Sequence, residues 1–133
     1  MKQLIKKYLK KKLNKSHPKH YCFLRWLANI VMDKEQTKDV CASIARWMYD
    51  NKYSLQKLPL NDIFVLDNKI YIYTFRPGLW IGKAGSTVYS CEDSINHNVN
   101  GVKVHNYEIH FIEIHKTPFT ELYGFLVSYE NYY

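Results

Sequence analysis

The chain has 133 residues, of which 47% are hydrophobic, and its formal net charge is +7. This length suits one small globular domain with an extension. The uncharged apolar stretches are too short to span a membrane, and an aromatic content of 16% is too high for a disordered polar chain. The composition therefore excludes a transmembrane protein and an unstructured tail, and we expect no membrane partner.

The positive charge is concentrated at the N-terminus. Residues 1–20 hold eight lysines and no acidic residue, whereas the rest of the chain carries 11 basic and 12 acidic residues. Apolar residues recur there at helical spacing, at Leu4, Ile5, Tyr8, Leu9 and Leu13, which predicts a basic amphipathic helix. Such a helix can lie on a membrane, act as an import signal, or pack on its own domain while its lysines contact RNA phosphates. Import signals prefer Arg and Ser to Lys, and the later segments favour the contact with RNA.

Two more helices are predicted before the pattern changes. Residues 21–32 present a wide apolar face made by Phe23, Trp26, Leu27, Ile30 and Val31. Asp33 and Gln36 then form a capping box for a helix that ends near Asn51. Its apolar positions are Val40, Cys41, Ile44, Trp47 and Met48. We expect the aromatic and Met residues to lie in the core, without a ligand role.

After Pro59 the spacing becomes that of β-strands. Residues 63–66 are an apolar run, Asp67 and Asn68 predict a turn, and residues 70–75 alternate, so a hairpin is expected. A further strand is predicted over 107–114. Thr117 and Pro118 then begin a predicted C-terminal helix, which is followed by a tyrosine-rich end.

Three of the five glycines, Gly78, Gly82 and Gly85, fall within eight residues. A short apolar turn precedes Gly82, and Ser86 and Thr87, which favour a helix start, follow Gly85. The expected order of helix, strand, strand, helix, Gly-x-x-Gly, helix, strand resembles the type II KH module, whose loop clamps the backbone of about four nucleotides. Lys83 would add a positive charge to this loop. The spacings of a P-loop and of a dinucleotide fingerprint are absent.

The resemblance extends beyond the loop. The string from Ile72 to Gly85, IYTFRPGLWIGKAG, resembles the I-x-T-x-R-P-G-x-x-I-G-K-x-G signature of the third protein of the ribosomal small subunit. Weaker similarities are YLKKKL at 8–13, which resembles that family's basic helix, and IHFIEIHKTP at 109–118, which resembles its last KH strand. The family resemblance implies an α+β, type II KH fold, with a three-stranded sheet and helices on one face. It also implies binding to ribosomal RNA in the head of the small subunit, near where messenger RNA enters.

The chain departs from this family in three places. Two helices are inserted over 21–51, Ala84 stands where the loop often has a second base, and the chain ends at Tyr133, before the family's C-terminal domain. We therefore expect no unwinding of messenger RNA. The chain is expected to be one half of a split protein or a free-standing KH protein.

The expected units are a basic helix with two inserted helices over 1–56, a KH domain over 57–118 and a C-terminal helix with a tyrosine-rich tail over 119–133. The residues expected to contact RNA are Arg76, Gly78, Gly82, Lys83, Ala84, Gly85 and Ser86 around the loop and Lys6, Lys7, Lys10, Lys11, Lys12 and Lys15 in the basic helix. Trp80 and Ile81 are expected to be core and groove floor rather than stacking platforms.

Other chemistry is not indicated. Cys22, Cys41 and Cys91 form no C-x-x-C pair, which favours reduced thiols. His105, His110 and His115 are five residues apart, so a strand places the middle one on the opposite face. We find no catalytic constellation, and we expect no enzyme activity, cofactor or metal.

The expected function is structural, in a small ribosomal subunit. The expected partners are ribosomal RNA, neighbouring small-subunit proteins and a separate chain supplying the C-terminal domain. Abundant Lys, Asn, Ile and Tyr are typical of an A- and T-rich genome, which can be that of an organelle, a phage or a bacterium. Together with the expected split of the protein, this composition favours a mitochondrial protein over one in the cytoplasm of a bacterium or phage-infected cell. The alternative function is a free-standing KH protein that binds single-stranded RNA as a chaperone or regulator.

Overall fold

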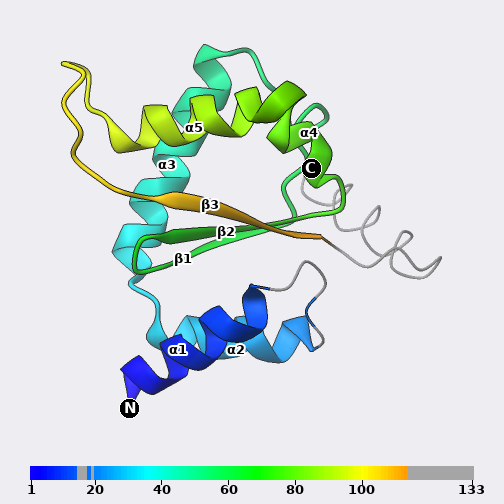
Figure 1. The fold of residues 1–133 in the computed structure, drawn as a ribbon, viewed down its shortest axis with the longest axis vertical. Helices are drawn as coiled ribbons and strands as arrows, with labels where there is room; N and C mark the ends of the chain where they lie inside the picture. The colour runs from blue at the N-terminus through cyan, green and yellow to red at the C-terminus, as the bar shows by residue number, and fades with distance from the viewer. Residues whose placement is uncertain (15–17, 19, 114–133) are drawn as a thin grey trace.

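The computed structural model describes residues 1–14, 18 and 20–113 (Figure 1). Its elements are α1 (Lys2–Leu13), α2 (Tyr21–Val31), α3 (Lys34–Asp50), β1 (Asp62–Leu66), β2 (Lys69–Thr74), α4 (Pro77–Ile81), the 3-10 helix η1 (Lys83–Gly85), α5 (Ser86–Asn96) and β3 (Glu108–Glu113). This confirms the α+β class and the predicted order of elements up to the last strand. The predicted helix at Thr117 and the tyrosine-rich end lie outside the described residues.

The three strands form one mixed sheet in the order β1-β2-β3. β1 and β2 are an antiparallel hairpin, whose turn places Asp67 at φ +56°, a conformation that Asp tolerates better than most residues. β3 pairs parallel with β2, with Ile70 beside Ile109 and Thr74 beside Glu113. The parallel return requires a crossover, and α4, η1 and α5 provide it.

Helices cover both faces of the sheet. The expectation of helices on one face holds for α4 and α5 of the expected KH unit, but it is wrong for the sheet as a whole, because α1 and α2 cover the second face. In Figure 1, α3, α4 and α5 lie above the sheet, and α1 and α2 lie below it. The cause is visible in the strands, because Val65, Ile70 and Ile72 point to one face while Phe64 and Tyr71 point to the other. All five side chains are 0–1% exposed, so both faces must be covered by apolar elements.

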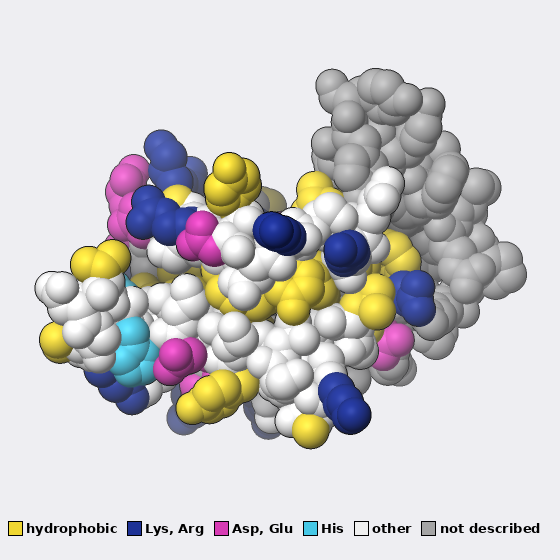
Figure 2. All heavy atoms as spheres, turned by 90° about the horizontal axis from the view of Figure 1, so that it is seen from above, with side chains coloured by type: hydrophobic (Ala, Val, Ile, Leu, Met, Phe, Trp, Pro, Cys, Tyr) yellow, Lys and Arg dark blue, Asp and Glu magenta, His cyan; other side chains and the backbone are white. Residues whose placement is uncertain are grey.

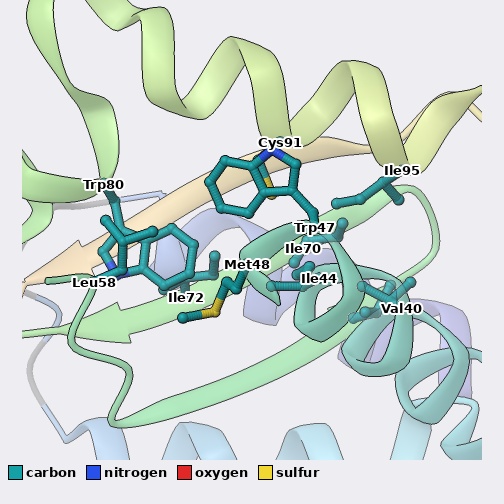
Figure 3. Packing of buried hydrophobic residues seen from close by; sticks show 11 residues of the cluster. Val40, Ile44, Trp47, Met48, Leu58, Ile70, Ile72, Trp80, Cys91 and Ile95 are labelled. Carbon is teal, nitrogen blue, oxygen red and sulfur yellow. The ribbon is translucent and has the colours of Figure 1, made fainter. Parts of the chain in front are cut away.

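The upper core lies between the sheet, α3 and α5 (Figure 3). Trp47 of α3 and Trp80 of α4 are its largest side chains, with ring centroids 6.4 Å apart. Each indole N–H has a partner, since Trp47 Nε1 donates to Ser90 Oγ at 3.1 Å and Trp80 Nε1 donates to the Pro59 carbonyl at 2.8 Å. These contacts confirm Trp47 and Trp80 as core residues and fix α4 at the end of β2.

The lower core lies between the sheet, α1 and α2. Leu9 and Leu13 of α1 and Leu24, Ala28 and Val31 of α2 are buried against it. The basic helix is therefore part of the sheet-centred core, together with α2, although both precede the region expected to be the KH domain.

The predicted apolar face of α2 is wrong in part. Phe23, Trp26 and Ile30 are 51%, 58% and 46% exposed, whereas Leu24 and Ala28 are buried. The sequence of α2 is apolar on almost every side, so hydrophobic spacing does not determine which flank is covered. The small side chain of Ala28 permits the close approach to the sheet.

The start of α3 is fixed by its predicted cap. The Asp33 carboxylate accepts the backbone N–H groups of Glu35 and Gln36. The Gln36 side chain does not complete the capping box. Its amide donates instead to the Asp67 carbonyl at 2.7 Å and to the Tyr107 hydroxyl at 3.2 Å, which joins α3 to the hairpin turn and to the segment before β3.

Candidate nucleic-acid interface

The Gly-x-x-Gly loop lies between α4 and α5, at the end of the sheet where β2 finishes. Arg76 precedes α4, whose first residue is Pro77, and Gly82 ends it. Three loop residues have positive φ: Gly82 at +75°, Ala84 at +55° and Gly85 at +78°. The backbone therefore turns sharply twice, which brings the N-terminus of α5 next to the end of α4.

Gly82 and Gly85 are glycines for different reasons. Gly82 combines φ +75° with ψ −178°, a region open essentially to glycine alone. A Cβ at Gly82 would also lie 2.1 Å from Thr87 Oγ1. At Gly85 the space is open, and only the left-handed backbone disfavours a side chain. The first glycine is thus fixed by packing against α5, and the second by conformation.

Several loop amides donate within the protein. The N–H of Gly82 donates to the Gly78 carbonyl, that of Gly85 to Gly82, and that of Ser86 to Lys83. These three donors stabilise the turn. These three amides are therefore already used within the protein.

The loop presents its charged side chains to solvent. Arg76, Lys83, Ala84 and Ser86 are exposed, and Gly82 and Gly85 are half-buried. Gly78, the remaining predicted position, is exposed on the first turn of α4. The structure therefore brings the seven predicted loop residues together at one end of the molecule.

The last two residues of α4 differ in burial. Of the two residues expected to be core and groove floor, Trp80 is fully buried in the core and Ile81 is 40% exposed.

The surface around the loop is only weakly basic. α5 contains Glu92 and Asp93 and no Lys or Arg. Glu92 has a structural role, because its carboxylate accepts the Ile109 N–H at 2.8 Å. On the side shown in Figure 2, Lys and Arg side chains stand singly or in small groups, with acidic groups between some of them. The local positive charge of the loop rests mainly on Arg76 and Lys83.

The lysines of α1 fall into two groups. Lys6 and Lys10 bind the Asp67 carboxylate of the hairpin turn, with Nζ–O distances of 3.0 and 2.6 Å. The hydrogen bond from Lys10, followed by that from Lys6, holds the pKa of the Asp67 carboxyl below its ordinary value of 3.8. These two lysines anchor α1 to the sheet, so part of their charge is already compensated.

The other α1 lysines face solvent. Lys7, Lys11 and Lys12 are exposed, and Lys12 lies over the Tyr8 ring, 5.7 Å from its centroid. Lys15 lies outside the described residues. Within the described part of the chain, the basic helix therefore offers three of its six predicted RNA-binding lysines to an external partner.

The two predicted basic elements lie on opposite sides of the sheet. α1 is in the layer below it, and the loop belongs to the layer above it (Figure 1). A partner that binds both must extend around the molecule.

The sequence did not indicate three residues that position these elements. Asp67 holds α1, and Asp62 accepts the Tyr21 hydroxyl at 2.9 Å and Arg25 Nε at 2.6 Å, which holds α2. Buried Asn96 exchanges two hydrogen bonds with the backbone of Tyr107, at 2.7 and 3.0 Å, and so directs the chain from α5 into β3. Each is a polar residue whose partner is distant in sequence, so no local pattern indicates it.

The described residues show no candidate metal centre. They contain no group of three or more His, Cys, Asp or Glu side chains placed to hold a metal ion. His110 Nε2 is 2.9 Å from the Leu13 carbonyl, and burial raises the pKa of the Cys91 thiol to about 12. No helix within the described ranges is long and apolar enough to cross a bilayer.

Comparison with family profiles, curated proteins and solved structures gives no match.

Proposed function

We propose that this protein is a KH-type RNA-binding component of a small ribosomal subunit, most consistent with a mitochondrial one, that holds ribosomal RNA by charge and shape. Its loop residues Arg76 and Lys83 and its helix residues Lys7 and Lys11 neutralise phosphates. No bond is made or broken. The protein positions RNA among neighbouring small-subunit proteins.

The order of elements supports the KH part of the proposal. A hairpin, a short helix, a Gly-x-x-Gly loop, a second helix and a strand parallel to β2 follow one another without insertion. The first glycine is sterically required against Thr87, as expected of a loop with one defined shape. The sequence resemblance from Ile72 to Gly85 falls on this unit.

The position of α1 supports folded RNA over a short single strand, and this observation carries the proposal. α1, which carries Lys7 and Lys11, lies on the opposite face of the sheet from α4 and α5, which flank the loop with Arg76 and Lys83. A folded ribosomal RNA can contact a small protein on several sides at once, whereas a free oligonucleotide at the loop uses only one.

The first test is gradient sedimentation of the tagged chain from its native source, in salt that removes loosely bound basic proteins. We expect the chain to migrate with the small-subunit RNA. Recovery only at the top of the gradient would contradict the ribosomal proposal and favour the alternative, a free-standing KH protein for single-stranded RNA.

The second test examines the loop directly. The double substitution Lys83→Asp, Ala84→Asp should weaken binding to a ribosomal RNA fragment, because two negative charges repel phosphate. The matched control is Gln56→Asp, Lys57→Asp, which makes the same change of charge at an exposed loop elsewhere. Equal losses in both variants would mean that net charge alone matters and that the loop is not a specific contact.

A further inference from the structure

One surface of the lower layer is not explained by RNA binding. On α1, Leu4, Tyr8 and Lys12 recur every four residues and so share one flank, opposite Lys6 and Lys10. Leu4 is 70% and Tyr8 is 45% exposed. This flank is separate from the ion pairs that fasten α1 to the sheet.

α2 carries a matching apolar flank. Phe23, Trp26 and Ile30 are each about half exposed, and the rings of Phe23 and Trp26 stack with centroids 6.0 Å apart. Tyr21 and Arg25 lie on the opposite flank, where they bind Asp62. We call the exposed residues Leu4, Tyr8, Phe23, Trp26 and Ile30 the lower apolar surface. α1 and α2 pack on each other and on the same face of the sheet, so these residues belong to one layer.

The charged residues of the two helices that carry this surface are all basic. Residues 1–32 contain nine Lys and Arg and no Asp or Glu. Lys12 lies directly beside the surface, over the Tyr8 ring. An apolar centre with aromatic residues and a charged rim is the composition of a protein–protein interface. Positive charge on one side favours negative charge on the partner.

We propose that the lower apolar surface binds a neighbouring protein through a segment that combines apolar residues with an excess of Asp and Glu. The partner of the lower layer is thus a protein. The inference rests on the proposed function only in expecting this partner in the same small ribosomal subunit. A second copy of the chain is disfavoured, because its own lower layer carries the same positive charge.

Two other partners fit less well. RNA gains little from Leu4 and Ile30, which offer neither a ring nor a polar group, and nucleic-acid interfaces are more polar than this surface. A flat bilayer would meet Lys7 and Lys11 first, because they point away from the buried stripe of Ile5, Leu9 and Leu13. The stripe that an amphipathic helix would insert into lipid is already buried against the sheet.

Site-specific photocrosslinking in intact cells of the native source tests the proposal. Trp26 is replaced by benzoylphenylalanine in one full-length chain and Ala84 in another, and each adduct is digested with nuclease or protease and sequenced. We expect the adduct at position 26 to be a protein, joined through a peptide rich in apolar residues and in Asp or Glu. We expect the adduct at position 84 to be RNA.

The composition of the crosslinked peptide does not by itself show that the apolar side chains bind it, so a second variant tests them. Phe23→Ser with Ile30→Ser should lower the yield at position 26 about tenfold, which corresponds to about 1.4 kcal/mol of binding. The control Tyr89→Ser, at a residue 71% exposed on α5, should leave it unchanged. Circular dichroism of both variants checks that they fold, and a misfolded double variant is replaced by Ile30→Ser alone.

The outcomes are distinct. An RNA or lipid adduct at position 26, a peptide without acidic excess, an adduct to residues 114–133 of the same chain, or no adduct overturns the docking proposal. Failure of RNA crosslinking at position 84 contradicts the proposed function instead. A protein adduct at 26 without RNA at 84 would therefore preserve the docking surface and reject the KH-type role.

Discussion

Gly82 shows how one residue couples the loop to the fold. Substitution Gly82→Ala places a Cβ 2.1 Å from Thr87 Oγ1 and forces alanine into a backbone region that it does not normally adopt. We expect the free energy of unfolding to fall by about 1–3 kcal/mol. Urea denaturation measures this loss.

The control for Gly82 lies four residues earlier. Gly78 is helical, and a Cβ there meets nothing within 4 Å, so Gly78→Ala should leave stability unchanged or raise it by up to about 1 kcal/mol. Equal losses in both variants would contradict the steric role of Thr87.

His110 gives a dependence on pH at the same scale. Burial, its largest influence, and the nearby Lys69 lower the pKa of His110 below its ordinary value of 6.5, while the hydrogen bond with the Leu13 carbonyl opposes this. The unfolded chain therefore binds more protons than the folded one just below pH 6.5, and the free energy of unfolding should fall as the pH decreases through that range. Denaturation at pH 7.5 and 5.5 measures it. His110→Phe should show a smaller fall, and an unchanged pH dependence would assign the effect to other groups.

At the scale of the element, α1 is held by apolar burial and by one acidic residue. Asp67→Asn keeps a side chain that tolerates the positive φ of the turn but removes the charge that binds Lys6 and Lys10. Because all three groups are partly exposed, we expect a loss of about 1 kcal/mol or less, with faster hydrogen exchange in α1.

The lowered pKa of Asp67 determines how its contribution to the free energy of unfolding changes in acid. Its contribution is present above pH 3.8 and decreases as the pH falls below that value, because the folded state must then take up a proton. The difference between wild type and Asp67→Asn should therefore narrow in acid. A difference in the free energy of unfolding that stays constant from pH 7 to pH 3 would contradict the ion-pair explanation. Faster hydrogen exchange in α5 alone, and not in α1, would contradict the role of Asp67 in anchoring α1.

The elements also show which features were predictable from sequence. β1 and β2 were predicted to within about one residue, because turn residues separate two short β-patterned runs. The apolar run Ile63–Leu66 already indicated burial on both faces, although only one helical layer was expected. The buried side of α2 was not predictable from hydrophobic spacing, because Phe23 and Leu24 are both apolar and lie on different sides of the helix. The small Ala28 and the contact with the sheet determine which side is buried. The spacing of the lysines also could not show that Lys6 and Lys10 are paired while Lys7 and Lys11 are exposed. Asp67, the partner of Lys6 and Lys10, is 57 or more residues away in the sequence.

At the scale of the whole molecule, the sheet separates two candidate sites of RNA binding. Lys83→Glu with Arg76→Glu reverses the charge of the loop, and Lys7→Glu with Lys11→Glu reverses two of the exposed charges of α1. For a long ribosomal RNA fragment, each pair should reduce the slope of log affinity against log salt by about 0.7 for every phosphate that the variant no longer neutralises. Filter binding over a salt series measures both slopes.

The combination of the two pairs separates one-sided from two-sided binding. If RNA wraps the molecule, the sites are distant and share no partner, so their losses of binding free energy should add within about 0.5 kcal/mol. With an oligonucleotide of about four to six nucleotides, only the two loop substitutions should lower the affinity. The reason is that α1 and the loop lie on opposite faces of the sheet. If both pairs weakened binding of the short strand equally, α1 and the loop would act as one binding surface. That result would contradict two separate sites on opposite faces of the sheet.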